Sequence, residues 1–594
     1  MYTIKKGFLM KALLIRKKMS VIFVMSLFAL FLVGCSHLFD GSGNNQSPTY
    51  PISSIVLTTL QRTIEPDLLL DTVLKIFPYE VAKYTQNGYG SWQYGPGLSS
   101  IVRYDIMPRE YAAATDGIDS KNKEKSVQLL NFFAFTDIHI TDKESPAQAI
   151  FAGFKSGNSS AYSPIMLYTT HVLDAAVQTI NALHKQQPFD FGISLGDTCN
   201  ATQYNELRWY IDVLDGKKIT PSSGSHVGAD SIDYQKAYKA SGLDKTIPWY
   251  QVLGNHDHFW MGFLPANEYI RNTLIGDTIL NLGNPLKDPL GADSRGFYTG
   301  AIDGHTPYGD IIGAGPVGDF PVAPKIFAAD KNRRSLTRFG WIAEFFKTTS
   351  KPIGHGFSQS AMQSGFACYA FEPKVDVPLK VIALDDTQRD DDPINPNSLG
   401  YGHGSLDPLR YNWLIEQLDA GQANDQLMII AAHIPIGDAY VGTQHGWERE
   451  LHTKLIAKLH TYPNLILWIA GHRHENTVTP FISPDNAHPE YGFWQVETAS
   501  LRDFPQQFRT FKIVLNYDNT ISIITINVDP AVQDGSLAAT SRSYAVAAQQ
   551  IFKNPVEYMP SGTYNAELLK QLTPRMQQKM QLLYKYIVKQ INKD

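Results

Sequence analysis

The sequence has little cysteine, little charge and no surplus of positive charge. Three cysteines in 594 residues cannot form a disulfide framework, which argues against a disulfide-stabilised scaffold. The formal net charge of −5 leaves no basic excess to neutralise phosphates, which argues against a protein that coats nucleic acid. Apolar residues make up 43% of the chain, and this is the composition of a globular protein with a sizeable core.

A long apolar run is also missing from the N-terminal region. Residues 21–33 form a 13-residue run without charge, whereas a membrane-spanning helix needs about 20 residues. Six basic residues precede the run, and Leu32-Val33-Gly34-Cys35 ends it. This arrangement is typical of a secretory signal, and its end resembles a bacterial lipobox. We therefore expect a lipoprotein signal peptide over residues 1–34, with lipid attached at Cys35; an uncleaved signal anchor is the alternative.

Removal of the signal would leave an acidic chain that depends on its anchor. The first 34 residues carry six basic and no acidic side chains, so the net charge would fall from −5 to −11. Such a chain is repelled by anionic lipid surfaces. The expected location is the cell envelope, on the periplasmic or extracellular face of a bacterial membrane. Cys199 and Cys368 either pair there or stay buried as free thiols.

Changes in pattern divide the rest of the chain. Residues 35–50 are rich in Gly, Ser and Asn and indicate a flexible tether. Residues 51–126 form an N-terminal extension, and residues 127–530 alternate strand-like with helix-like segments, which predicts an α/β domain. The alternation fails at about residues 259–377, an insertion that either covers an active site or forms a peripheral subdomain. Residues 531–594 are predicted to be a helical C-terminal segment.

Five predicted strands are each followed at once by Asp, Asn or His. The strands are residues 129–136, 189–195, 247–253, 426–432 and 465–470. The polar residues after them are Asp137, His139, Asp197, Asn255, His256, Asp257, His433, His472 and His474. Ligands gather beyond the carboxyl ends of strands in α/β sheets, so these side chains are expected to converge.

The convergence predicts a site for two metal ions. Two carboxylates, one amide oxygen and four imidazoles are too many for one tetrahedral ion and suit two. Two ions about 3.5–4 Å apart clamp the oxygens of an in-line phosphoryl displacement. Asp197 offers two oxygens and a negative charge, which fits a bridging ligand. Imidazole and oxygen donors suit divalent or trivalent Fe, Mn or Zn. Taken singly, any of these residues would more often be a polar turn at a strand end.

The five motifs resemble those of the calcineurin-like metallophosphoesterase superfamily. In order they are Asp137-x-His139, Gly196-Asp197, Gly254-Asn255-His256-Asp257, His433 and Gly471-His472-x-His474. The match spans about residues 130–500. It implies a four-layer α/β/β/α sandwich, in which two sheets pack face to face between helices with the metals at one edge.

The resemblance also implies a role for each motif residue. One ion would be bound by Asp137, His139 and His474, the other by Asn255, His433 and His472, with Asp197 bridging. His256 would act as general acid or stabilise charge on the phosphorane-like state. Asp257 would hydrogen-bond and orient His256. Arg473 and Arg502 are expected at the surface, although Arg502 could instead meet a phosphate oxygen.

The expected function is hydrolysis of a phosphate monoester or diester by a hydroxide that bridges two metals. The partner is a small phosphoester, and the membrane is reached only through the lipid anchor. A metal- or phosphate-binding envelope lipoprotein without turnover is the alternative from another class. A metal-dependent hydrolase of non-phosphate esters is the third reading.

Overall fold

The computed structural model describes most of the chain after residue 55. The described residues are 56–67, 84–98, 102–105, 126–150, 164–224, 232–283, 295–303, 310–390, 401–436, 449–552 and 565–591. The signal, Cys35 and the tether therefore lie outside the described residues. None of the described helices is long and apolar enough to cross a membrane.

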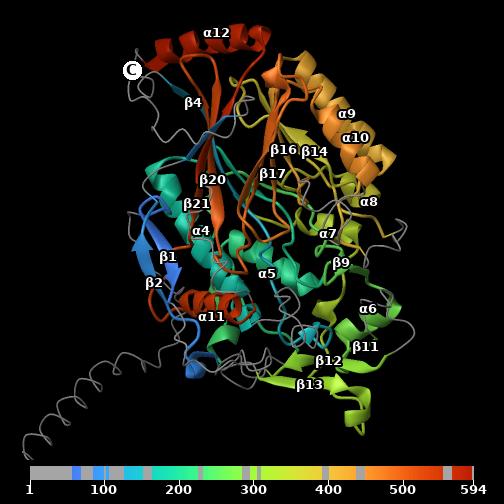
Figure 1. Cartoon of the computed structure of the whole chain (residues 1–594). Helices are drawn as coiled ribbons and strands as arrows, with labels where there is room; N and C mark the ends of the chain where they lie inside the picture. Colours follow the sequence, from blue (N-terminus) through green and yellow to red (C-terminus); the bar gives the residue numbers. More distant parts are fainter. Residues whose placement is uncertain are drawn as a thin grey trace, which may run out of the picture. The chain divides into compact units, whose positions relative to one another are not determined.

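The larger sheet has seven strands and joins segments from both ends of the described chain (Figure 1). β4, β5 and β8 run parallel at one edge, and β20 pairs antiparallel with β4. Its strands, in spatial order, are β3 (Val102–Asp105), β22 (Ala566–Lys570), β21 (Ile521–Val528), β20 (Phe508–Leu515), β4 (Val127–Phe135), β5 (Phe191–Ser194) and β8 (Trp249–Gln251).

The second sheet has six strands, and four of them are parallel neighbours. The outer strands β14 and β18 pair antiparallel. In spatial order the strands are β14 (Tyr369–Phe371), β15 (Leu379–Ala383), β16 (Leu427–Ala431), β17 (Leu465–Ala470), β19 (Phe493–Glu497) and β18 (Thr477–Phe481). β15, β16 and β17 are buried on both faces and are apolar except for Lys380, as parallel strands covered on both sides should be.

Alternation along these strands shows how the second sheet is covered. Ile429 and Ile469 belong to the main core, together with Phe132 and Phe511 of the seven-stranded sheet. Ile430 and Trp468 point the other way, into a separate core with α9 (Pro408–Ala423) and α10 (Arg449–Leu459). Successive strand residues face opposite sides, so the second sheet lies between the first sheet and these two helices (Figure 1).

The sequence encodes the start of α9. Asp407 caps α9, because its carboxylate accepts the backbone N–H of Arg410, and Pro408 occupies the first helical position. The other helices are α4 (Thr169–Gln186), α5 (Tyr204–Leu214), α6 (Glu268–Ile275), α7 (Arg338–Glu344), α8 (Ala361–Ser364), α11 (Leu537–Phe552) and α12 (Pro574–Ile591). The short strands outside the two large sheets are β1 (Arg62–Pro66), β2 (Trp92–Pro96), β6 (Lys218–Ile219), β7 (Tyr238–Lys239), β9 (Phe259–Trp260), β10 (Leu264–Pro265), β11 (Asn281–Leu282), β12 (Phe297–Ile302) and β13 (Ile311–Pro316).

The structure moves two of the predicted segment limits. Residues 566–570, which we assigned to a helical C-terminal segment, form β22 and pair with β21 and β3. Within the same segment α11 (Leu537–Phe552) is helical as predicted, and the last helix, α12, starts at Pro574, where the missing N–H costs nothing. β14 pairs with β15, so the sheet begins inside the predicted insertion. β22 is fixed by pairing with β21 and with β3 from the other end of the chain, whereas the three-residue β14 pairs with β15, the next strand along. Segments this short leave little trace in the local sequence pattern. Cys199 and Cys368 are buried free thiols.

A buried histidine in α4 predicts how stability responds to acid. The His171 ring stacks on Tyr238, with centroids 4.4 Å apart. Burial lowers the pKa of His171 to about 3, below its unfolded value of about 6.5. Between these values the unfolded chain holds a proton that the folded chain does not. The free energy of unfolding therefore falls as the pH falls, by about 1.4 kcal/mol per pH unit from this residue.

We expect His171→Phe to flatten that slope, because phenylalanine keeps the stacked ring and cannot titrate. Urea unfolding at pH 7.5 and pH 5 measures the difference for both proteins. Other buried groups that titrate at low pH affect the variant and the parent alike. The difference between the two pH slopes of the free energy of unfolding therefore isolates His171. Equal slopes would show that His171 is protonated in the folded chain.

Candidate metal centre

The five motif loops leave parallel strands of both sheets at their carboxyl ends. The seven-stranded sheet supplies the loops after β4, β5 and β8, and the six-stranded sheet supplies those after β16 and β17. Backbone hydrogen bonds tie the loops together: the His139 N–H donates to the Asp197 carbonyl, and the Gly471 N–H donates to the His433 carbonyl. The structure thus brings together all seven residues predicted as ligands.

Five of these seven residues have a left-handed backbone. Their φ angles are 52° at Asp137, 46° at His139, 53° at Asp197, 71° at His472 and 58° at His474. A residue with a side chain rarely adopts this conformation, which costs of order 1–3 kcal/mol each. Strain of this kind persists where the surrounding structure enforces it, and it gathers at functional sites.

Glycines allow the loops to approach this closely. A Cβ on Gly254 would lie 2.2 Å from the backbone nitrogen of Asp197, and one on Gly471 would lie 2.1 Å from Thr136 Oγ1. Neither position has room for a side chain. Gly254 and Gly471 therefore allow the close spacing between neighbouring loops.

Asp137, His139 and His474 form one group of side-chain donors. The Nε2 atoms of His139 and His474 are 3.1 Å apart. Asp137 Oδ1 lies 3.3 Å from His474 Nε2 and 3.7 Å from His139 Nε2. Among the described residues Asp137 Oδ1 is buried without a hydrogen-bond partner, while Oδ2 accepts from Thr136 and from the His472 backbone. The free oxygen thus faces the two imidazoles.

Asn255, His433 and His472 form the second group. Asn255 Oδ1 lies 2.8 Å from His433 Nε2 and 3.1 Å from His472 Nδ1. The two imidazole nitrogens are 3.2 Å apart. The Asn255 amide nitrogen donates to the Gly262 carbonyl at 3.0 Å, which turns the amide oxygen toward the histidines.

Asp197 lies between the two groups. Its Oδ2 is 3.7 Å from His139 Nε2 in the first and 3.4 Å from His433 Nε2 in the second. Its Oδ1 accepts the backbone N–H of His256 at 2.8 Å, so the carboxylate is held by a rigid loop. One carboxylate oxygen is therefore shared by both groups.

These separations fit donors that surround cations. Two atoms bound about 2.1 Å from one ion, at angles of about 90–110°, lie about 3.0–3.4 Å apart. The distances within each group fall at or near this range. Several of these close pairs join two acceptor atoms, and the available protons cannot turn every pair into a hydrogen bond. Asp137, His139 and His474, and likewise Asp197, His433 and His472, could each hold an ion. The donor set of imidazole, carboxylate and amide suits Zn, Fe or Mn.

The electrostatic field at the site favours positive charge. Burial opposes protonation of His433, but the Asp197 carboxylate overrides it and raises the pKa of His433 to about 10. Burial likewise opposes protonation of His474, and the charges of Asp137 and Asp503 raise its pKa to about 10. Despite burial, the neighbouring His433 lowers the pKa of Asp197. A field that holds protons on two buried imidazoles also attracts metal cations.

Outer partners fix which imidazole nitrogen faces the site. His433 Nδ1 lies 2.8 Å from the Leu195 carbonyl, which can only accept, so Nδ1 carries the proton and Nε2 faces the cluster. His474 Nδ1 hydrogen-bonds to the Asp503 carboxylate. Asp386 accepts the backbone N–H groups of His433 and Ile434. Such partners orient metal-binding histidines and raise their basicity.

His256 adjoins the first group. Its Nδ1 lies 2.8 Å from the Asn200 carbonyl, so Nδ1 carries a proton and Nε2 is the free nitrogen. The ring meets His139 edge-on at 4.4 Å. Burial lowers the pKa of His256 to about 3. A ring nitrogen of His256 also lies within 4.8 Å of donor atoms of His139 and Asp197.

The predicted role of Asp257 is wrong. Its carboxylate does not bond the His256 ring but accepts the backbone N–H groups of Asp197, Thr198, Cys199 and Gly254. Burial, and then the charge of Asp197, raise the pKa of Asp257 to about 7. Asp257 therefore joins the second and third motif loops. The Asp257 carboxylate therefore points toward these backbone N–H groups and not toward the His256 ring.

Of the two arginines expected at the surface, Arg502 is buried and Arg473 is partly buried. Arg473 forms a two-pronged ion pair with Glu497 of β19. Arg502 is 1% exposed and donates to the Asn200 side chain. Because the Asn200 carbonyl bonds the His256 ring, Arg502 helps to position this candidate catalytic residue through Asn200.

Sequence reasoning missed several groups that shape the site, among them the carboxylates of Asp503 and Asp386 and the carbonyls of Asn200 and Gly262. Asp503 directly follows Arg502, and an Asp beside an Arg is usually a surface pair. The carbonyls act through the backbone, so no side-chain pattern signals them. The acidic residues at positions 386 and 503, which follow the core strands β15 and β19, offered the available clue.

No family model and no curated protein matches the sequence. Among solved structures, the chain is similar to a dimetal phosphatase from Danio rerio, with 10% identity, a TM-score of 0.35, and coverage of 68% of this chain and 100% of that one. It is also similar to a proposed 5′-nucleotidase from Staphylococcus aureus, crystallised with alpha-ketoglutarate, with 13% identity, a TM-score of 0.26, and coverage of 69% and 57%. Both TM-scores are low, and neither similarity assigns a role to a residue of this chain.

Proposed function

We propose that this protein is a metal-dependent phosphoesterase with a two-ion centre that hydrolyses a phosphate monoester or diester. The observation that carries the proposal is the pair of donor groups joined by Asp197, whose Oδ2 lies 3.7 Å from His139 Nε2 and 3.4 Å from His433 Nε2. Asp137, His139 and His474 would hold one ion, and Asn255, His433 and His472 the other. Two cations here would supply charge for the phosphoryl oxygens and acidify a bound water.

The residues of the chain itself would position and assist the reaction. His256 Nε2 lies beside the first group, and Nδ1 is anchored on the Asn200 carbonyl. A phosphoester in the centre brings negative charge, which favours the protonated imidazole. His256 would then donate from Nε2 to the leaving oxygen or stabilise charge in the transition state.

The proposal includes the architecture and the location of the enzyme. The packing of the two sheets on each other and of α9 and α10 on the second sheet gives three of the layers of the proposed four-layer α/β/β/α sandwich, with the centre at the carboxyl edge of both sheets. The pattern of residues 1–35 supports a lipid-anchored envelope protein attached through Cys35. Replacing Cys35 with Ser should release the chain from the membrane fraction.

We expect His256→Ala to separate metal binding from turnover. Hydrolysis of p-nitrophenyl phosphate and bis-p-nitrophenyl phosphate should fall by about 10²–10⁴-fold, the usual contribution of a proton-transfer residue. Elemental analysis should still find the metal content of the parent. His488→Ala, at an exposed histidine, is the matched control and should keep both.

Three outcomes would contradict the proposal. Full turnover by His256→Ala would remove the role of His256. A metal-loaded parent that binds phosphate and cleaves neither ester would indicate a binding protein without turnover. Faster cleavage of carboxyl esters than of phosphoesters would move the enzyme to another class.

A further inference from the structure

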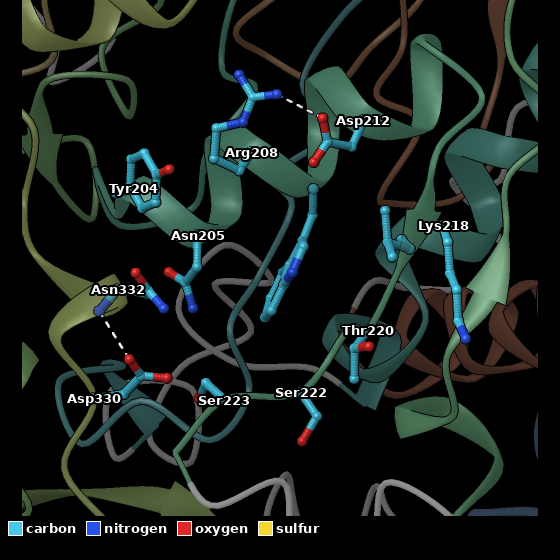
Figure 2. Close-up of a pocket in the computed structure, with 12 residues that line it drawn as sticks. Tyr204, Asn205, Arg208, Asp212, Lys218, Thr220, Ser222, Ser223, Asp330 and Asn332 are labelled. Atoms are coloured by element: carbon cyan, nitrogen blue, oxygen red, sulfur yellow. Dashed lines mark hydrogen bonds and ion pairs between the residues drawn. The ribbon is translucent and has the colours of Figure 1, made fainter. Parts of the chain in front are cut away.

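A cavity of about 350 Å³ lies beside α5, and none of the seven candidate metal ligands lines it (Figure 2). Arg208 pairs there with Asp212 at 2.5 Å, and the Asp330 carboxylate accepts the backbone N–H of Asn332 at 2.8 Å (Figure 2). These charged groups are already used within the protein, so they do not point to a ligand. The surface of α12 differs, because it carries charges that the fold does not use.

The last described helix, α12, lies along the outside of the fold and is basic (Figure 1). It carries four basic side chains and no acidic one, in a chain whose net charge is −5. Its exposed residues recur at spacings of three and four, which places them on one side of the helix. We call this side the α12 face, and its residues are Arg575, Gln578, Leu582, Lys585, Tyr586 and Lys589.

The fold of α12 depends on its opposite side. Met576 and Met580 are buried in the main core, and this contact holds the helix against the sheets. On the α12 face, by contrast, Leu582 is 69% exposed and Tyr586 is 53% exposed. These two side chains lie one helical turn apart with lysines beside them. Apolar side chains flanked by lysines on an exposed helix face are typical of helices that contact a lipid surface.

Two lysines of the α12 face are available to a partner outside the chain. Arg575 pairs with Asp425 at 2.7 Å. Within the described part of the chain, neither Lys585 nor Lys589 takes part in an ion pair, and both side chains are exposed. The partner that complements this face is therefore anionic and also accepts apolar side chains.

We propose that the α12 face docks on the anionic lipid surface of the membrane to which the chain is attached. Lysines are attracted to anionic head groups, while leucine and tyrosine enter the interface. Charges of the acidic chain that lie beyond a Debye length of about 10 Å from the lipid are screened, so one basic face can make contact. The proposal rests on the lipid anchor at Cys35, which holds the face near the membrane and lets a weak contact suffice.

Docking through α12 would turn the candidate metal centre away from the bilayer. Arg575 pairs with Asp425 just before β16 begins. The Tyr584 ring lies 6.4 Å from Tyr517, in the turn between β20 and β21. Both contacts are at the amino ends of β16 and β4, because β20 pairs antiparallel with β4, whereas the centre is at their carboxyl ends. The substrate would then be a water-soluble phosphoester and not a lipid of the same membrane.

Lysine footprinting of the full-length chain tests the docking. The chain is purified from membranes with its anchor and reconstituted into vesicles of phosphatidylcholine, alone or mixed with phosphatidylglycerol. Exposed lysines are acetylated, and mass spectrometry measures the reaction at each. Lys585 and Lys589 should be protected in the anionic vesicles alone, and added salt should remove the protection. Lys331, exposed on another element, should react equally in every sample.

Variants of the α12 face should weaken this protection. Lys585→Gln should lower the docking equilibrium about 5-fold, the usual effect of one lysine near an anionic surface, and the protection of Lys589 reports it. Leu582→Gln should also lower it, because an apolar contact is lost. Lys331→Gln is the matched control and should leave Lys589 protected. Hydrolysis of p-nitrophenyl phosphate should be equal in both kinds of vesicle and in all three variants, since the centre stays open to water.

Several results would overturn the docking. Protection of Lys589 that is absent, or equal in both kinds of vesicle, would remove the role of anionic lipid. Protection in detergent before lipid is added would mean that a second copy of the chain covers the face. Protection by polyglutamate but not by vesicles would assign an acidic macromolecule instead. A chain that attaches to neither kind of vesicle would lack the anchor on which docking rests, whereas a chain that docks and hydrolyses no phosphoester would refute the proposed function alone.

Discussion

Replacing Asp197 with asparagine is expected to abolish hydrolysis and to release both metal ions. The substitution keeps the size of the side chain and removes the negative charge that both donor groups share. Asp197 Oδ2 is the atom close to both His139 and His433, and the Asp197 charge holds the pKa of His433 at about 10. An amide cannot offset two cations. The loss of affinity should exceed the ~10–100-fold that removing an outer partner of a metal ligand costs.

Elemental analysis after dialysis, and hydrolysis of the two p-nitrophenyl esters, measure the two effects together. Asp518→Asn is the matched control, because Asp518 is exposed in the turn between β20 and β21. It should retain full metal and full activity. Asp197→Asn that keeps two ions per chain would show that this carboxylate does not join the groups.

The sequence predicted the candidate metal centre better than it predicted the limits of the strands and segments around it. Five strand ends carried Asp, Asn or His, and the rule that ligands collect at carboxyl ends of strands needs only those positions. β22 and β14 were misplaced because each is short: β22 has five residues and β14 has three. β22 is also fixed by pairing with β21 on one side and with β3, from the other end of the chain, on the other. No local periodicity encodes such a pairing.

The site's supporting groups escaped prediction for a different reason. Asp257 follows His256 in sequence, yet its carboxylate accepts four backbone N–H groups from two loops. Which of two adjacent side chains turns toward the cluster depends on the φ and ψ of the loop. A motif fixes residue types and leaves that choice open.

The region predicted as an insertion is part of the centre. Gly262, only a few residues after the third motif, accepts the Asn255 amide and so sets which amide atom faces the histidines. Farther along, Arg333 is buried against Asp142, three residues after His139. A purely peripheral subdomain would make neither contact. The described part of this region therefore supports the motif loops.

Asp503 has the largest expected effect on metal affinity among residues outside the seven candidate ligands. Its carboxylate bonds His474 Nδ1, and its backbone is held by Ser500 Oγ at 3.2 Å. With Nδ1 occupied, His474 must present Nε2 to Asp137 and His139. Without Asp503 the ring can rotate, and its nitrogen loses electron density. Carboxylate partners of this kind typically change metal affinity by about 10–100-fold.

We therefore expect Asp503→Ala to lower the affinity of the first ion position by about 10–100-fold and to leave the second position occupied. Asp503→Asn keeps an acceptor without the charge and should fall between the parent and the alanine variant. Competition with a chelator, followed by elemental analysis, should show one ion lost before the other, and KM for phosphoesters should change less than kcat. Asp419→Ala, at an exposed carboxylate bonded to Tyr462, controls for loss of an acidic side chain. An effect confined to the His474 ring spares the second group of Asn255, His433 and His472. Simultaneous loss of both ions from Asp503→Ala would therefore mean that Asp503 supports the motif loops as a whole and not His474 in particular.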